Sequence, residues 1–150
     1  MRSQPVGAAR RYLATPPKWR MTTGRALMWC ACASAVAAAA TGLPGVTASG
    51  PGSLMAETWR LYGFLVFAAL FALLAYRPLG YRWVWEIVIV NKLLLAVTAG
   101  GFALGVLGPG EEVSGAVDAA VADGLLVVVA VLAYVLCRGW RAGPRASTPE

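Results

Sequence analysis

Residues 83–107 read WVWEIVIVNKLLLAVTAGGFALGVL, and this stretch decides the fold. At about 1.5 Å of rise per residue, a helix of this length exceeds the ~30 Å hydrocarbon core of a lipid bilayer. Glu86 and Lys92 are its only charged residues. The stretch therefore predicts a membrane-spanning helix that tilts, or extends beyond the bilayer at its start.

Three more apolar runs, residues 26–43, 59–76 and 117–137, are also long enough to cross a bilayer. Of the 150 residues, 59% are hydrophobic and 13% are charged, whereas a soluble domain carries about 25% charged residues. The predicted fold class is all-α, an integral membrane four-helix bundle surrounded by lipid bilayer. The short link 77–82 makes the helices on either side of it antiparallel neighbours.

The two ends of the chain are polar. Residues 1–25 are basic and interrupted by prolines, and residues 138–150 also contain prolines. We predict that both are disordered cytoplasmic tails on either side of one transmembrane domain, residues 26–137. The run 26–43 is rich in alanine and is the weakest span, so a cleaved signal peptide is the alternative to a retained helix. The long basic segment that precedes it favours the retained helix.

The distribution of charge predicts the orientation in the membrane. All basic residues except Arg60 and Lys92 lie in the two tails or in the link 77–82, whereas the other two loops carry Glu57, Glu111 and Glu112. Cytoplasmic segments of membrane proteins have an excess of Lys and Arg. Both termini are therefore predicted to be cytoplasmic, and four spans are consistent with this because an even number places the two ends on the same side. The residues expected to form an aromatic belt on this side are Tyr76, Tyr81, Trp83, Trp85, Tyr134 and Trp140.

Polar residues at membrane depth are the candidates for a functional site, because each is costly there unless it is paired. They are Arg60, Glu86, Asn91, Lys92, Asp118 and Asp123. By helical rise, Lys92 lies about 13 Å and Asp123 about 22 Å from the cytoplasmic edge, a difference that tilt and side-chain reach can close. We predict a buried Lys92–Asp123 pair and a contact from Arg60 to Asp118 or Asp123. These groups form either a structural polar network that fixes the helices, or a functional site that is a proton relay or an anion-binding cavity.

Gly101 and Gly105 form a GxxxG motif, whose small residues allow two helix backbones to approach closely. We predict that they pack against the alanine-rich first helix; homodimerisation is the alternative. Cys30, Cys32 and Cys137 are expected to be buried and inert, and Cys30 and Cys32 point in opposite directions on a helix, so they cannot share a metal.

Several function classes are excluded by composition. The chain has no histidine, which removes imidazole general bases and His-ligated zinc. It has no Walker, GxSxG, HExxH or CxxC motif, so we expect neither catalysis nor a metal or cofactor. The net charge of +6 flanks apolar segments instead of covering a polar surface, so nucleic acid is not an expected partner.

Residues 59–138 resemble the small four-span bacterial proteins of the DoxX-like group and related families. The likeness lies in Arg60-Leu61-Tyr62-Gly63, the short basic turn, Asn91-Lys92-Leu93-Leu94 and Asp123-Gly124. The resemblance implies a four-helix bundle in the bacterial inner membrane and no particular chemistry. We therefore expect a non-enzymatic accessory or partner-binding membrane component, in contact with a second copy or another membrane protein. The alternative is a small proton-coupled transporter that acts as a dimer.

Overall fold

The computed structural model describes residues 16–81, 83–108 and 113–142, and these fold into helices joined by short turns. The long helices are α2 (Lys18–Ala48), α3 (Leu54–Tyr76), α4 (Val84–Ala103) and α5 (Ala116–Cys137), and a short 3-10 helix, η1 (Gly139–Arg141), follows α5. Each of the four long helices has the length and apolar composition needed to cross a membrane. The predicted all-α fold class is confirmed, and the described part of the chain has the architecture of a multi-pass membrane protein.

The first helix begins earlier than predicted. Residues 18–25, assigned above to a disordered tail, form the first two turns of α2. Pro17 directly precedes the helix, where a proline is well tolerated because the first N–H groups have no partner in the helix. Met21 packs against the core and Gly24 is buried, so the segment has an inner face. Residues 1–15 lie outside the described part.

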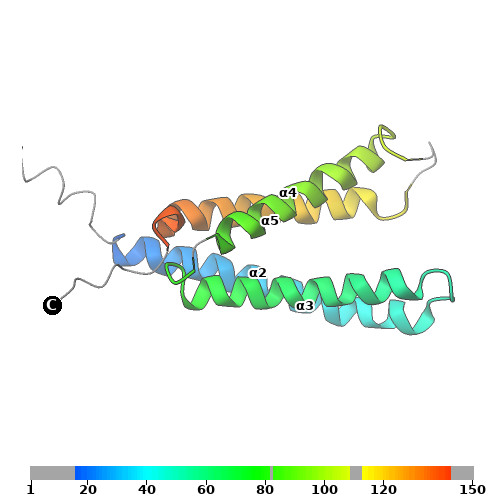
Figure 1. Ribbon diagram of the computed structural model, residues 1–150, viewed down its shortest axis with the longest axis horizontal. Helices are drawn as coiled ribbons and strands as arrows, with labels where there is room; N and C mark the ends of the chain where they lie inside the picture. Colours follow the sequence, from blue (N-terminus) through cyan, green and yellow to red (C-terminus); the bar gives the residue numbers. More distant parts are fainter. Residues whose placement is uncertain (1–15, 82, 109–112, 143–150) are drawn as a thin grey trace, which may run out of the picture.

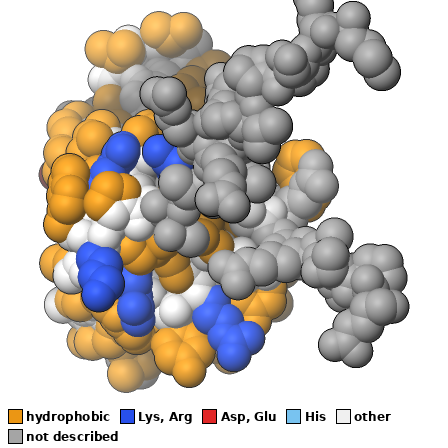
Figure 2. All heavy atoms as spheres, turned by 90° about the vertical axis from the view of Figure 1, so that its left-hand side faces the viewer, with side chains coloured by type: hydrophobic (Ala, Val, Ile, Leu, Met, Phe, Trp, Pro, Cys, Tyr) orange, Lys and Arg blue, Asp and Glu red, His pale blue; other side chains and the backbone are white. Residues whose placement is uncertain are grey.

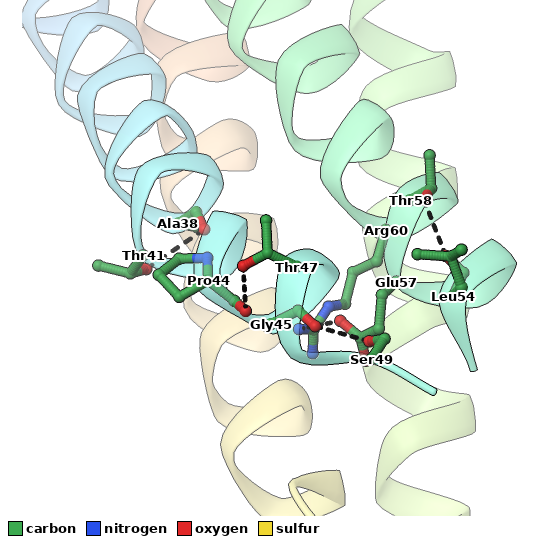
Figure 3. Close-up of polar contacts among 10 residues, drawn as sticks. All are labelled: Ala38, Thr41, Pro44, Gly45, Thr47, Ser49, Leu54, Glu57, Thr58 and Arg60. Carbon is green, nitrogen blue, oxygen red and sulfur yellow. Dashed lines mark hydrogen bonds and ion pairs between the residues drawn. The ribbon is translucent and has the colours of Figure 1, made fainter. Parts of the chain in front are cut away.

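The loop predicted at residues 44–57 is also shorter than expected, because α2 continues through Pro44 to Ala48 and α3 starts at Leu54. Pro44 has no N–H to donate, and hydroxyl groups on both sides of it donate to backbone carbonyls (Figure 3). Thr41 Oγ1 donates to Ala37 O at 2.9 Å, Thr47 Oγ1 to Pro44 O at 3.0 Å and Ser49 Oγ to Gly45 O at 2.6 Å. The prediction that α2 ends before Pro44 rested on the Gly, Pro and Ser content of the segment, and it placed the end of the helix too early.

The long helices are arranged as two antiparallel hairpins, α2 with α3 and α4 with α5 (Figure 1). The hairpins come together at the end where α2 begins and α5 ends, and they diverge toward the other end (Figure 1). We call these the packed end and the splayed end. The core lies in the half nearer the packed end; it comprises Met28, Ala31, Ala35, Ala68, Phe71, Leu74, Ala75, Trp85, Val88, Ala130, Ala133 and Cys137.

The hairpins are joined mainly where α2 packs against α5, since α3 and α4 make few contacts with each other. α3 and α4 are antiparallel, as the short link predicted, but they are not close neighbours over their length. Gly24 of α2 lies at a close approach of α2 and α5: a Cβ atom there would collide with Cys137 Sγ and lie 3.4 Å from Ala133 O. The missing side chain lets the two helices approach, as small residues do in membrane bundles.

We expect Gly24→Ala to lower the stability of the protein by about 1–3 kcal/mol, because the added methyl group overpacks the contact with Cys137. The melting temperature of the purified protein in a mild detergent, followed by helical circular dichroism, measures the effect. Gly63→Ala is the matched control, because a Cβ at Gly63 meets nothing within 4 Å. The control should be neutral or slightly stabilising, as alanine is the better helix former. Equal melting temperatures for the two variants would contradict the assignment.

Candidate functional site

An ion pair within the bundle is the most distinctive polar feature of the described residues. Lys92 Nζ, from α4, lies 2.7 Å from Asp123 Oδ1, from α5. Lys92 is only 4% exposed, and its Nζ also lies 4.1 Å from the centre of the Phe67 ring of α3. The structure thus brings together the two residues whose depths in the sequence suggested a pair, and adds an aromatic face from a third helix.

The surroundings of Lys92 account for its burial. An ammonium group removed from water is strongly destabilising unless a counter-ion and further contacts replace its hydration. Asp123 supplies the counter-ion, and the negative face of the Phe67 ring supplies a cation–π contact. Removing one partner of a buried pair typically costs about 3–5 kcal/mol, since the other charge is left unpaired. The ion pair therefore joins α4 to α5, and the contact between Lys92 and Phe67 joins α4 to α3.

A second polar contact joins α4 and α5 nearer the packed end. The Tyr134 hydroxyl donates to Glu86 Oε1 at 3.0 Å, and Glu86 Oε2 is buried without a hydrogen-bond partner among the described residues. The Tyr134 ring also makes edge-on contacts with Trp85 and Trp140, at centroid distances of 5.9 and 5.6 Å. We predicted Glu86 as a polar network residue, but sequence reasoning missed its partner Tyr134.

The turn after α5 explains how these aromatic rings meet. Arg138 adopts a left-handed conformation (φ 56°), which reverses the chain into η1. Gly139 is buried, and a Cβ there would collide with the Tyr134 ring and lie 2.9 Å from Trp85 Cδ1. Trp85 is fully buried, and its Nε1 donates to Pro78 O at 2.8 Å. Trp85 is therefore a core residue and not part of the predicted aromatic belt, and residues 138–142 are ordered instead of forming a disordered tail. Residues 143–150 are outside the described part.

Arg60 does not reach Asp118 or Asp123, so that prediction is wrong. Its Nη2 lies 2.5 Å from Glu57 Oε2 on the same helix, and Gly45 of α2 is beside this pair (Figure 3). The reason is the divergence of the hairpins, which separates the start of α3 from α5 (Figure 1). The Arg60 side chain is 55% exposed, and exposed pairs of this kind contribute little.

Asn91 and Asp118 are both exposed, and the structure brings neither into the Lys92–Asp123 contact. Asn91 precedes Lys92 on α4 and lies on the outer surface of the bundle. Asp118 is in the first turn of α5, where a carboxylate interacts favourably with the positive end of the helix dipole. Neither residue therefore adds to the buried network.

Among the described residues, the GxxxG motif does not pack against the first helix, which corrects that prediction for Gly101 and Gly105. α4 ends at Ala103, and Gly105 lies in the following turn with φ +67°. The Gly101 carbonyl accepts hydrogen bonds from the N–H groups of Val106 and Leu107, at 2.9 and 3.0 Å. The atoms nearest a Cβ at Gly101 belong to Leu107, and nothing lies near one at Gly105. The two glycines end the helix and turn the chain.

The described residues contain no group of three or more His, Cys, Asp or Glu side chains that could hold a metal ion. Cys30 is exposed, Cys32 is half-buried and Cys137 is buried, so the prediction of burial was wrong for Cys30. Comparison with protein-family models, curated proteins and solved structures gives no match to this chain. The fold therefore defines a class, a multi-pass helical membrane protein, and the resemblance to the DoxX-like group stays a prediction.

We expect Tyr134→Phe to lower stability by about 1–3 kcal/mol, because the Glu86 carboxylate loses the hydroxyl that donates to it. Thermal unfolding in detergent measures the loss. Tyr76→Phe is the matched control, since Tyr76 is exposed and belongs to the last turn of α3. If both variants have the melting temperature of the original protein, the Glu86–Tyr134 contact does not contribute to stability.

Proposed function

We propose that this chain is a non-enzymatic accessory component of a bacterial inner membrane, with cytoplasmic termini, which binds another membrane-embedded chain through its splayed end. The observation that supports it most is the uneven packing of the bundle. Beyond Lys92, no residue of α4 is buried. Large apolar side chains are exposed along the whole bundle, and at the splayed end they have few buried residues behind them; those exposed there include Leu54, Met55, Trp59, Leu104, Val106, Val117 and Val121.

The polar contacts are consistent with a structural role inside such a component. Lys92–Asp123 and Glu86–Tyr134 both join α4 to α5, so they fix a rigid hairpin. Lys92 is paired with Asp123, and Tyr134 donates to one oxygen of Glu86, so these contacts are made within the chain. The partner would then bind the apolar helix faces that are exposed at the splayed end.

Site-specific photo-crosslinking in native membranes tests the partner. A photoreactive amino acid at Val121, at the splayed end, should give a discrete protein adduct whose partner mass spectrometry identifies. The same amino acid at Leu132 is the matched control, because Leu132 is also exposed on α5 but lies near the packed end. An adduct of the chain with itself would identify the partner as a second copy. Lipid adducts alone at Val121, or the same protein adduct from both positions, would contradict the proposal.

The structural role of the ion pair predicts a double-mutant result. Asp123→Asn and Lys92→Met should each lower the stability by about 3–5 kcal/mol, because each leaves one partner unpaired within the bundle. Each should therefore also reduce the amount of folded protein. The double variant should recover part of the loss, since no unpaired charge remains. Detergent-resistant folded protein, measured by fluorescence-detected size exclusion, gives the comparison. Additive losses in the double variant would contradict a direct role of the pair.

A proton-coupled transporter is the second candidate, favoured by the partial exposure of Asp123. Its side chain is 18% exposed, whereas that of Lys92 is 5% exposed, so the carboxylate is the more accessible partner. In a relay, Asp123→Asn would abolish proton-coupled solute flux in proteoliposomes while the amount of folded protein stayed unchanged. In the structural role, the same substitution reduces the amount of folded protein. One variant therefore separates the two candidates.

A further inference from the structure

The packed end carries a basic surface that the proposed partner contact does not use. The cationic side chains described at this end are Lys18, Arg20, Arg25, Arg77, Arg138 and Arg141. Figure 2 views the molecule from this end; Lys and Arg side chains gather on it among apolar ones, and no Asp or Glu side chain is visible. A surface of one sign at the end of membrane-spanning helices lies at the level of the lipid headgroups.

Within this surface, the junction of α2 and α3 has a defined geometry. Arg25 Nε donates to Ala75 O, in the last turn of α3, at 2.8 Å. This bond uses one of the donors of the guanidinium group, holds the side chain across the two helices and leaves its terminal NH₂ groups free of any hydrogen bond to a described residue. Arg77 follows Ala75 by two residues. Lys18 precedes Arg25 by seven residues, so it lies on the same face of α2, about 10 Å further along the helix axis.

The positive charge at this junction is not neutralised by the described residues. Described ion pairs link Arg60 with Glu57 and Lys92 with Asp123, both away from the packed end. Arg77 contacts the Tyr76 ring, with its guanidinium carbon 5.8 Å from the centroid, and Arg20 is placed similarly over Trp19 at 5.9 Å. In addition, Arg20 Nε is buried with no hydrogen-bond partner among the described residues. Among the described residues, no carboxylate forms an ion pair with Lys18, Arg25 or Arg77.

We propose that Arg25 and Arg77, where α2 and α3 meet, bind the phosphate of an anionic phospholipid, with Lys18 adding positive charge about two turns away on the same face of α2. Guanidinium groups bind phosphate through paired, charge-assisted hydrogen bonds, and Arg25 is already oriented by its bond to Ala75. The apolar surfaces of α2 and α3 below the junction accommodate the acyl chains. Trp19 and Tyr76, both 65% exposed, are amphipathic rings of the kind that lie at headgroup level. A phosphate ion without acyl chains would lack these apolar contacts.

Native mass spectrometry of the full-length protein, titrated with phosphatidylglycerol or phosphatidylcholine in a neutral detergent, tests the site. Phosphatidylglycerol should bind more tightly, and each removed cation should weaken it about five-fold, as expected for a basic residue at an anionic membrane surface. Arg77→Gln tests one side chain, and Lys18→Gln with Arg77→Gln tests two; both leave the Arg25–Ala75 bond in place. Arg60→Gln is the matched control, because it removes the same charge at the splayed end.

The outcomes are distinct. Weaker phosphatidylglycerol binding in the Arg77 variant, with unchanged binding in the Arg60 variant, supports the site. Equal weakening in both variants overturns the site, because it shows that only the net charge matters. Equal binding of the two lipids also overturns it, because it shows that lipid contact is not selective for the anionic headgroup. Inorganic phosphate that competes at a concentration similar to that of the lipid would overturn the lipid assignment. The inference rests on the membrane setting of the helices and not on the partner at the splayed end, so either proposal can fail alone.

Discussion

The arrangement of the bundle depends on the close approach of α2 and α5 at Gly24 and Cys137. Each hairpin has its own internal contacts, but α3 and α4 meet only sparsely, so the α2–α5 contact is what makes the hairpins one body. In lipid there is little hydrophobic drive for helices to associate, and close van der Waals packing has to supply it. A glycine on one helix and small residues on the other, Ala130, Ala133 and Cys137, meet that requirement. The contact lies at one end, and the helices are correspondingly free to diverge at the other.

The sequence was sufficient for features that depend on average properties of long segments. Hydrophobic length predicted the four helices, because a bilayer sets a minimum span that few other environments impose. Their boundaries were less predictable, because caps and side-chain hydrogen bonds decide them. Pro44 does not end α2, and α4 ends at Ala103 because the chain turns at Gly105. The basic residues of 18–25 suggested a polar tail, yet a helix can bury one face and direct its cations toward the headgroups.

The candidate site was partly predictable for a related reason. Lys92 and Asp123 are the only oppositely charged residues deep within the third and fourth apolar runs, so their pairing followed from depth alone. Glu86 and Tyr134 could not be paired in this way, because their contact depends on the rotation of α4 against α5 and on the reversal at Arg138 that brings η1 back. The prediction for Arg60 was wrong for the opposite reason. Its depth allowed a contact with α5, but the hairpins diverge and Arg60 lies too far from that helix. Depth is readable from sequence, whereas helix rotation and crossing angle require the packed structure.

The Lys92–Asp123 pair also has a consequence for biosynthesis. A single charged residue near the centre of a spanning helix raises the free energy of its insertion by roughly 2.5–3.5 kcal/mol. α4 carries one such residue and α5 carries its counter-ion, so each helix alone enters the bilayer less readily than its apolar residues suggest. Entry as a paired hairpin, with the ions already matched, lowers both costs. The last two helices are therefore best delivered by the translocon together, with α4 retained until α5 has been synthesised.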